Sequence, residues 1–449
     1  MVDMSKFKVI SLFSGAGGLD LGLVQTGKFK IIFANDILES SLITYSRNIG
    51  LKFVKSINKN VKAREGVALV SDVSKVDFSA FDTEADLVIG GPPCQDFSII
   101  RGKYRGGIKV KRGKLYEYFV KVLEMLKPNI FVFENVAGLV SANNGLAYKV
   151  ILKDFTSAGY ELIFADLVNF ANLGVPQKRE RLIIIGIRRD LIEDDIMVLW
   201  CARSKIEKVL RGEKWLFRKY PLTSIEVFEG DRLDNLNDVY IEVMKKWDGI
   251  WKEVGTERAY EWKEKVWDKL SFDIINDYLF INNIKYKSSD ELEVAFVQHE
   301  ALLKELKYYK KPVYKLNLPD GTTKIPFEST SVLERMRRIP PDENYEFVEG
   351  TVWSVKGGRI SQIYRRIHPL KPSYTITAYG GGGTHGYHYD RDRSMLTLRE
   401  KARLQTFPDE FLFYGNEGEI KAQIGEAVPP LAGKRIGEVI VDVLKTINN

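Results

Sequence analysis

The stretch Val9–Leu23, VISLFSGAGGLDLGL, decides the fold. An apolar run reaches Phe13, glycines follow at positions 15, 17 and 18, and an apolar helical pattern begins at Leu19. Glycines allow a tight turn and a close approach of the backbone to a ligand. The spacing F-x-G-x-G-G differs from the G-x-G-x-x-G of dinucleotide-binding enzymes, so the turn alone is a weak signal of function. It predicts a strand that ends at a ligand site and continues into a helix.

Strand-like and helix-like segments alternate outward from this stretch through the first 190 residues. The predicted strands cover residues 8–13, 30–35, 68–71, 86–90, 130–133, 161–168 and 181–187. The predicted helices cover residues 19–25, 38–48, 115–126 and 147–158. This alternation predicts an α/β fold with a doubly wound, mostly parallel sheet. Ligands of such sheets bind beyond the carboxyl ends of the strands.

A change of composition near residue 190 predicts a second, smaller domain. All seven tryptophans lie at or after Trp200. Aromatic residues between 235 and 270 recur at mostly helical spacing, which favours a hydrophobic core over a platform for stacking nucleobases. The segment 436–447 has the pattern of an amphipathic helix.

Composition excludes several classes of protein. With 45% hydrophobic residues the 449-residue chain can bury a large core. No apolar run approaches the ~20 residues of a membrane helix, and the start of the chain has no apolar stretch of a signal peptide. Two cysteines, Cys94 and Cys201, cannot form a disulfide framework or an all-cysteine zinc site, so we expect a reducing cytosolic compartment. His385 and His388 lack a third ligand at suitable spacing, so no metal site is expected.

Positive charge is concentrated in one segment. The net charge is +7, and residues 101–114, RGKYRGGIKVKRGK, contain seven basic and no acidic residues. A solvated loop and a surface that binds a polyanion are both consistent with this run taken alone.

Two acids follow predicted strands at the ligand edge. Asp36 comes after the second strand, where a carboxylate suits a ribose diol, and Asp72 comes after the third, where it could accept from an adenine amino group. Each could equally be a turn former or a helix cap. Their common location favours an adenosine-type cofactor.

The run Asp86–Ser98, DLVIGGPPCQDFS, places Cys94 on a rigid Pro-Pro turn at the same edge. A lone cysteine is usually a small buried hydrophobe. A thiol on a rigid turn, followed by a basic segment that favours the thiolate, is better interpreted as a nucleophile. A cysteine protease would need a histidine partner, and the four histidines all lie far downstream.

Two further motifs supply polar groups. In IFVFENVAGL, residues 130–139, a very apolar strand delivers Glu134 to its end, where desolvation would raise its pKa. In GVPQKRER, residues 174–181, Arg179 and Arg181 face the same side of an extended chain and could bind a carbonyl or a phosphate. A capping acid and a solvated basic turn are the alternatives.

Together, in this order and spacing, these motifs resemble the DNA cytosine-5 methyltransferase family. The resemblance covers about residues 8–190 and 356–445. It includes Pro-Pro-Cys-Gln, Glu-Asn-Val and Gln-x-Arg-x-Arg, and the later runs RRIHPLKPSYTITA (365–378), LTLREKARLQTFPDEF (396–411) and QIGEAVPPLAGKRIG (423–437).

The resemblance implies roles for the motif residues. Cys94 would add to carbon 6 of cytosine, so that carbon 5 can attack a sulfonium methyl group. Glu134 would bind or protonate ring nitrogen 3, and Arg181 would bind the base carbonyl. Arg179 would support Glu134, and Gln177 belongs to the same implied catalytic set. The base would have to be flipped out of the duplex.

The implied cofactor is S-adenosylmethionine. The residues expected to bind it are Phe13, Ser14, Gly15, Gly17, Gly18, Leu19, Asp36, Ile37, Asp72, Val73, Pro93, Leu115, Ala427 and Val428.

The implied partner is double-stranded DNA, with no membrane. The residues expected to contact DNA are Arg101, Lys103, Arg105, Lys111, Arg112, Arg365 and Arg366. The implied domains are 1–190 for catalysis and cofactor, 191–420 with a target-recognition region at about 191–355, and 421–449 returning to the catalytic domain. A monomeric bacterial enzyme of the cytosol and nucleoid, paired genetically with a restriction endonuclease, is the corresponding expectation.

The sequence departs from the family pattern at two points, and other functions stay open. Ile37 stands where the family often has an aromatic residue, and Glu426 stands in Gly425-Glu426-Ala427-Val428 where the family usually has asparagine. The main alternative is a tRNA cytosine-5 methyltransferase. A catalytically idle DNA-binding protein and a nicotinamide oxidoreductase are the other two.

Overall fold

The computed structural model describes residues 6–56, 61–79, 81, 84–93, 115–192, 196–355, 363–378 and 386–447. The chain forms two compact units. The first unit comprises Met1–Leu173, Arg179–Lys214 and Ala427–Asn449, and the second comprises Gly174–Lys178 and Trp215–Glu426. The chain therefore passes between the units four times.

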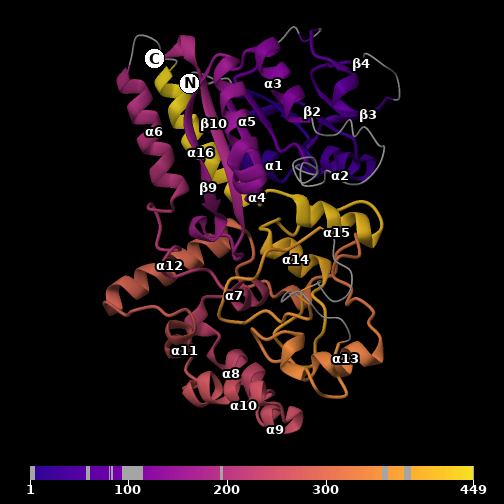
Figure 1. Ribbon diagram of the computed structural model, residues 1–449, viewed down its shortest axis with the longest axis vertical. Coiled ribbons are helices and arrows are strands. Elements are labelled where there is room, and N and C mark those ends of the chain that lie inside the picture. Colours follow the sequence, from indigo (N-terminus) through magenta and orange to yellow (C-terminus); the bar gives the residue numbers. More distant parts are fainter. Residues whose placement is uncertain are drawn as a thin grey trace. The chain divides into compact units, whose positions relative to one another are not determined.

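An eight-stranded sheet forms the centre of the first unit, in the order β3-β5-β2-β1-β7-β8-β10-β9 (Figure 1). The strands are β1 Phe7–Leu12, β2 Phe29–Asp36, β3 Lys52–Lys55, β5 Val67–Val70, β7 Leu87–Gly90, β8 Ile130–Val136, β9 Tyr160–Asn169 and β10 Glu180–Arg188. Only β10 runs antiparallel to its neighbours β8 and β9 among the described pairs. The predicted doubly wound, mostly parallel sheet is confirmed.

All seven predicted strands are present, and the sequence reading missed three short ones. β3 lies at the sheet edge beside β5, while β4 (Val61–Lys62) and β6 (Val76–Asp77) form a separate parallel pair. These strands have two to four residues, none of them buried, so they carry almost no periodic signal.

The helices of the first unit cover the sheet (Figure 1). They include α1 Gly18–Gln25, α2 Glu39–Ile49, α3 Leu115–Leu126, α4 Gly138–Ser141, α5 Leu146–Ser157, α6 Ile196–Leu210 and α16 Pro430–Ile447. The last helix begins six residues before the predicted Ile436, because proline is well accommodated in the first turn of a helix.

Helices α1 and α16 pack at very short distance. A Cβ atom added to Gly433 would lie 2.7 Å from the carbonyl oxygen of Leu19, and one added to Gly437 would lie 2.8 Å from the Leu23 side chain. On the facing helix, a Cβ on Gly22 would collide with the backbone of Pro430. Side chains at these positions would force the helices apart, so glycine is required by the packing.

Helix α6 extends the first unit beyond the predicted limit at residue 190. Its buried face, formed by Ala202, Ile206 and Leu210, packs on β9 and α16. Arg203 adds an ion pair with Glu161 of β9, with its Nη2 2.6 Å from Oε1. The first unit therefore runs to Lys214 and resumes at Ala427, not at residue 421.

The second unit is mainly helical and has its own core. Its helices are α7 Ser224–Glu229, α8 Asn237–Lys245, α9 Ile250–Val254, α10 Glu257–Lys265, α11 Ile274–Ile281, α12 Ser289–Glu305, α13 Thr330–Met336, α14 Leu398–Leu404 and α15 Glu417–Glu426. Trp247, Trp251 and Trp262 are buried, which confirms that aromatics of the 235–270 stretch form a core.

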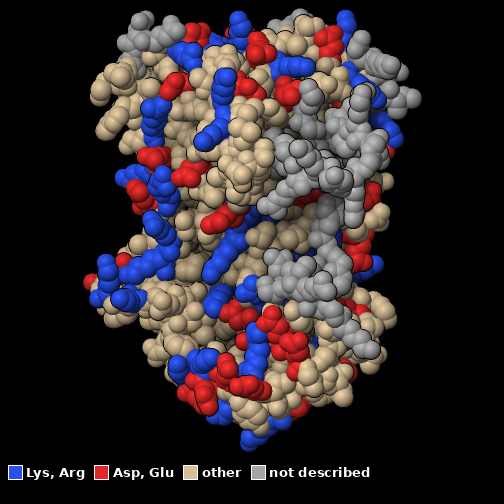
Figure 2. All heavy atoms as spheres, in the orientation of Figure 1, with Lys and Arg blue, Asp and Glu red and all other residues tan. Residues whose placement is uncertain are grey.

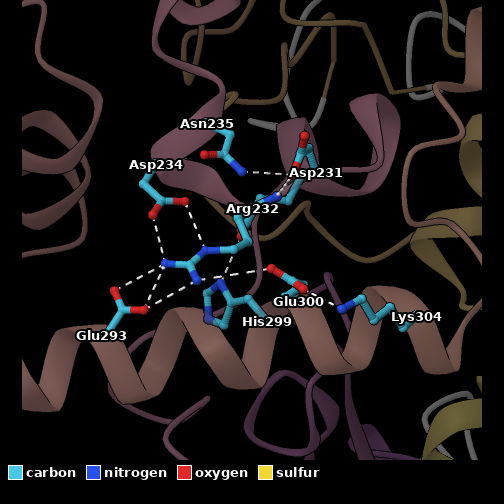
Figure 3. A network of polar contacts seen from close by, with 9 residues as sticks. Asp231, Arg232, Asp234, Asn235, Glu293, His299, Glu300 and Lys304 are labelled. Atoms are coloured by element: carbon cyan, nitrogen blue, oxygen red, sulfur yellow. Dashed lines mark hydrogen bonds and ion pairs between the residues drawn. The ribbon is translucent and has the colours of Figure 1, made fainter.

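A polar network ties α12 to the segment before α8 (Figure 3). Arg232 binds Asp234 at 2.7 Å and Glu293 at 3.1 Å through Nη2. On the same helix, Glu300 pairs with Lys304, and the His299 side chain is buried. This part of the second unit is held by ion pairs as well as by its apolar core.

Basic and acidic side chains are interspersed over the face of the molecule drawn in Figure 2. Several arginines of the first unit are already paired, such as Arg211, whose Nη2 lies 3.2 Å from a Glu207 oxygen. Among the described residues no helix is long and apolar enough to cross a membrane.

Candidate active site

The glycine-rich turn between β1 and α1 adopts left-handed backbone conformations. Phe13, Gly15 and Gly17 have φ angles of 53°, 53° and 87°. A Cβ atom on Gly17 would lie 2.6 Å from the ring of Tyr45, whereas one on Gly15 would meet nothing within 4 Å. The Ser14 hydroxyl is buried and has no hydrogen-bond partner among the described residues. The turn is therefore packed against Tyr45 at Gly17. It keeps open space at Gly15 and a Ser14 hydroxyl that can still form a hydrogen bond.

Asp36, at the end of β2, shapes this turn. Its Oδ2 accepts from the Gly15 amide at 2.8 Å, and its Oδ1 accepts from the Leu38 amide at 2.8 Å. Burial raises the pKa of Asp36 despite these hydrogen bonds. Ile37, the next residue, is 65% exposed and so offers an apolar surface beside the carboxylate.

Asp72 follows β5 at the same edge and acts as a cap. Its Oδ1 accepts from the Ser74 amide at 2.9 Å in the single turn Val73–Lys75. The Val73 side chain is buried in the hydrophobic core. The capping interpretation of Asp72 is confirmed, and a contact of either residue with a cofactor stays a prediction.

Asp20 and Tyr45 lie beneath the turn, and the sequence reading missed both. Asp20 is 1% exposed, and the Tyr45 hydroxyl donates to its Oδ1 at 2.8 Å. Burial raises the pKa of Asp20 to about 6, against the hydrogen bonds from Ser11 and Tyr45. The sequence contains one signal that could have identified Asp20: it is an acidic residue within the otherwise apolar run that starts α1.

Glu134 and Arg181 form a nearly buried ion pair. The Arg181 Nε lies 3.2 Å from the Glu134 Oε1, and the two side chains are 15% and 12% exposed. Burial raises the pKa of Glu134, while the charges of Arg181 and Arg179 oppose that rise. Burial therefore favours the protonated form of this carboxyl group more than water does, while the two arginines favour the charged form.

Glu134 does not lie at the end of its strand, as the sequence suggested. β8 continues to Val136, because antiparallel β10 pairs with it and places Ile183 opposite Glu134. The antiparallel partner therefore lengthens the strand and brings Arg181 close to the carboxylate.

The Pro-Pro turn is fastened to β8 beside Glu134. A Cβ on Gly91 would lie 2.7 Å from the Glu134 Oε2, and the Asn135 amide donates to the Pro92 carbonyl oxygen at 2.9 Å. Asn135 was missed as a functional residue, although it stands next to Glu134 in the quoted motif. The predicted nucleophile Cys94 follows two residues later and lies outside the described residues, as do Arg101, Lys103, Arg105, Lys111 and Arg112.

Arg179 is fully buried, and its Nη2 donates to the Ala427 carbonyl oxygen at 3.0 Å. Burial lowers the pKa of its guanidinium to about 9, and the nearby Arg181 lowers it further, while Glu134 acts in the opposite direction. The structure thus brings Arg179, Arg181 and Glu134 together.

Gln177 does not reach toward a substrate, which corrects its predicted catalytic role. Its Nε2 donates to the Leu404 carbonyl oxygen at 3.2 Å and to the Gln405 Oε1 at 2.9 Å. Its Oε1 accepts from the Ile376 amide at 2.8 Å. Both amide hydrogens and the oxygen are engaged inside the second unit, so Gln177 is a structural residue.

The other predicted cofactor residues differ in exposure. Leu19 and Val428 are buried, Leu115 and Ala427 are partly buried, and Pro93 is exposed. Glu426 is exposed and ends α15.

Arg366 is not available to DNA, which corrects a second prediction. Its side chain is 0% exposed, and its guanidinium donates to the carbonyl oxygens of Ile339 at 2.6 Å and Asp390 at 2.9 Å, among others. Such a buried guanidinium organises the loops around it. Arg365 lies partly exposed over the ring of Tyr374, 3.4 Å from its centroid.

Comparison with known proteins identifies a family and several relatives of this chain. The chain matches the family described as C-5 cytosine-specific DNA methylase over residues 7–442. It is 59% identical to the DNA (cytosine-5-)-methyltransferase M.ApeKI of Aeropyrum pernix, over 99% of this chain and 100% of that protein. It is 32% identical to the type II methyltransferase M.BbvI of Brevibacillus brevis, over 98% of this chain and 92% of that protein.

A solved structure shares the fold. The crystal structure of a DNA modification methyltransferase encoded within an E. coli prophage superposes with a TM-score of 0.56 at 21% identity, covering 98% of this chain and 100% of that one. The match to the family extends over nearly the whole chain and includes every motif described above. The chain therefore belongs to the C-5 cytosine-specific DNA methylase family.

Proposed function

We propose that the chain transfers a methyl group from S-adenosylmethionine to carbon 5 of a cytosine flipped out of double-stranded DNA. One observation carries the proposal: the Glu134–Arg181 pair lies against the Gly91–Pro92 turn that leads to Cys94. A carboxyl group with a raised pKa is thereby fixed next to the segment that carries the nucleophile.

The glycine-rich turn fits the cofactor. The open space at Gly15 allows a ligand to approach the backbone, and the buried Ser14 hydroxyl has a hydrogen bond to offer. Asp36 would hold the ribose, and the exposed Ile37 would cover the adenine. S-adenosylmethionine supplies the electrophilic methyl group.

The chain's own residues would activate the base. The Cys94 thiolate adds to carbon 6 of cytosine, and the electron pair of the 5,6 double bond moves toward carbon 5. Glu134 hydrogen-bonds or protonates nitrogen 3, and Arg181 binds the carbonyl oxygen. The Arg181 Nε holds the Glu134 carboxyl in place at 3.2 Å. After methylation, a water molecule takes the carbon 5 proton, the electron pair of that C–H bond re-forms the 5,6 double bond, and the bond from carbon 6 to sulfur breaks to release the Cys94 thiolate.

We propose DNA as the substrate. Of the expected target-recognition region at about 191–355, we propose the part in the second unit, which begins at Trp215, as the reader of the DNA sequence. The family and the names of the relatives favour DNA over tRNA. The segment 101–114 would contact phosphates, which explains its charge. A monomer in the cytosol, with a restriction endonuclease as its genetic counterpart, is the corresponding biological proposal.

The test is methyl transfer by the Cys94→Ala variant, with Cys201→Ala as the matched control. Cys201 is the other cysteine of the chain. It lies on α6, outside all the motifs that supply site residues. We expect no transfer to duplex DNA by Cys94→Ala and nearly normal transfer by Cys201→Ala. A duplex containing 5-fluorocytosine should trap the wild type as a denaturant-stable complex. An active Cys94→Ala protein would refute the covalent role, and transfer to tRNA alone would refute the substrate.

A further inference from the structure

Two segments of the second unit continue along the chain into residues of the candidate active site. Residues 174–178 belong to the second unit and run straight into Arg179. Helix α15, Glu417–Glu426, ends in the second unit and runs straight into Ala427. Arg179 and Ala427, the first residues after these two segments, are in contact within the first unit: the Arg179 guanidinium donates to the Ala427 carbonyl oxygen at 3.0 Å.

One side chain joins the two segments inside the second unit. Gln405, at the end of α14, is 0% exposed. Its Oε1 accepts from the Gln177 Nε2 at 2.9 Å, and its Nε2 donates to the Ile424 carbonyl oxygen. Gln177 lies two residues before Arg179, and Ile424 lies three residues before Ala427.

The direction of every bond in this bridge is fixed by its neighbours. The backbone amide of Ile376 can only donate, so the group that faces it must be the Gln177 oxygen. The Ile424 carbonyl can only accept, so the group that faces it must be the Gln405 NH2. The Gln405 oxygen is left for Gln177. A residue without both a donor and an acceptor at position 405 cannot complete the bridge.

The segment 174–178 is held from its other side as well. The Lys178 amide donates to the Ser373 carbonyl oxygen, and the Ser373 amide donates to the Pro176 carbonyl oxygen, both at 2.9 Å. The backbone that enters Arg179 is therefore pinned by Ser373, while the Gln405 bridge ties it to the end of α15. Without the bridge, the segment 174–178 and the end of α15 could move relative to each other, although each would keep its own local backbone structure.

We propose that Gln405 is a positioning residue for methyl transfer. By fixing the segment before Arg179 against the segment before Ala427, it sets the place of the Arg179 guanidinium. Arg179 in turn acts on Glu134 through its charge. Gln405 does not touch the reacting atoms in this proposal, which rests on the function proposed above.

The test compares Gln405→Leu with Gln423→Leu. Gln423 is another buried glutamine, on α15, and its Nε2 donates to the Tyr414 carbonyl oxygen at 2.8 Å, which is not part of the bridge. We expect Gln405→Leu to lower kcat on the order of 10- to 100-fold, as small misplacements of catalytic groups do. KM for DNA and for S-adenosylmethionine should stay within about twofold, and Gln423→Leu should stay within about threefold in every constant.

A double variant supplies the second readout. Gln177 and Gln405 act through the hydrogen bond that joins them, and either substitution breaks it. The kcat of the double variant Gln177→Leu with Gln405→Leu should therefore be no lower than that of the slower single variant. If Gln405→Leu does not fold, Gln405→Met takes its place, with folding checked by thermal unfolding. Equal losses at 405 and 423, multiplicative losses in the double variant, or a loss confined to KM would each overturn the proposal. A wild type that fails to methylate cytosine would overturn the proposed function instead.

Discussion

Two buried glutamates with cationic partners differ in how many of their oxygens are in use. Glu226, in the second unit, has its Oε1 2.8 Å from His299 Nδ1, and its Oε2 accepts from the Thr223 amide and hydroxyl at 3.0 and 2.8 Å. Glu134, in the first unit, has Arg181 Nε at 3.2 Å, and its Oε2 lies against Gly91. Among the described residues, the carboxylate of Glu226 has three polar partners spread over both oxygens, whereas that of Glu134 has the Arg181 Nε and keeps more acceptor capacity.

The difference separates a structural carboxylate from a reactive one. The His299 Nε2 faces the Tyr220 carbonyl oxygen at 2.9 Å, so that nitrogen carries a hydrogen, and one further proton is shared with Glu226. The network is complete without any ligand. A group meant to bind a substrate must instead leave a lone pair or a proton unused, at a cost in stability.

The largest expected effect is the loss of activity in Glu134→Gln. The amide keeps the size of the side chain but cannot supply a proton, so kcat should fall about 10²- to 10⁴-fold. Steady-state methylation assays measure the fall, with the exposed Glu124→Gln on α3 as the matched control. Thermal unfolding is measured alongside, because Arg181 loses its carboxylate partner and some loss of stability is expected. Activity within threefold of the wild type would assign Glu134 a structural role like that of Glu226.

Glu226→Gln should show the opposite pattern. It leaves His299 buried without its carboxylate partner, and the free energy of unfolding of the second unit should fall by about 3 kcal/mol. Six of the seven tryptophans lie in this unit, so tryptophan fluorescence in urea reports on it. Glu293→Gln, which removes an exposed partner of Arg232, should cost less than about 1 kcal/mol. Equal effects of the two variants would contradict the comparison.

The His299–Glu226 pair should also make stability depend on pH. Burial lowers the pKa of His299, but the charge and hydrogen bond of Glu226 and the bond to Tyr220 outweigh it, and the net pKa is raised above 6.5. The stabilisation is fully present below pH 6.5 and is lost as the pH rises through the raised pKa. Urea unfolding between pH 6 and 9 should therefore show falling stability, and His299→Gln should flatten the curve. A wild-type curve that rises over this range would contradict the assignment.

The smallest expected effect concerns an exposed glutamate, Glu426. Because it is solvated at the end of α15, Glu426→Asn should keep activity within about twofold, whereas Glu426→Leu should lose more of it by removing a polar anchor. Steady-state kinetics on both variants measure this. If both lose activity equally, the negative charge itself is needed at this position.

Sequence patterns predicted the sheet because its strands are buried runs of Val, Ile and Phe, whose composition is independent of distant partners. They located Glu134, Arg179 and Arg181 through motif spacing. They misjudged the end of β8, since its length depends on pairing with β10, which lies 44 residues further along the chain.

The errors at Gln177 and Arg366 have a common cause. A polar side chain in a motif can serve the substrate or the protein, and only its partners distinguish the two. The partners of Gln177 lie 199 to 228 residues away in sequence, at Ile376, Leu404 and Gln405. Asn135 was overlooked for the same reason, because its partner Pro92 belongs to another motif.

The close packing of α1 on α16 has a consequence for synthesis of the protein. Gly433 follows Gly22 by 411 residues, so a ribosome that adds ~5–20 residues per second needs roughly 20–80 s between them. During that interval the glycine face of α1 lacks its partner, while the ribosome makes most of the second unit, Trp215–Glu426, as one continuous stretch. The second unit is itself complete only at Glu426, seven residues before Gly433, so the two units receive their last helices almost together. The nascent first unit would then expose apolar surface until its final helix emerges, which makes it the part most dependent on chaperones.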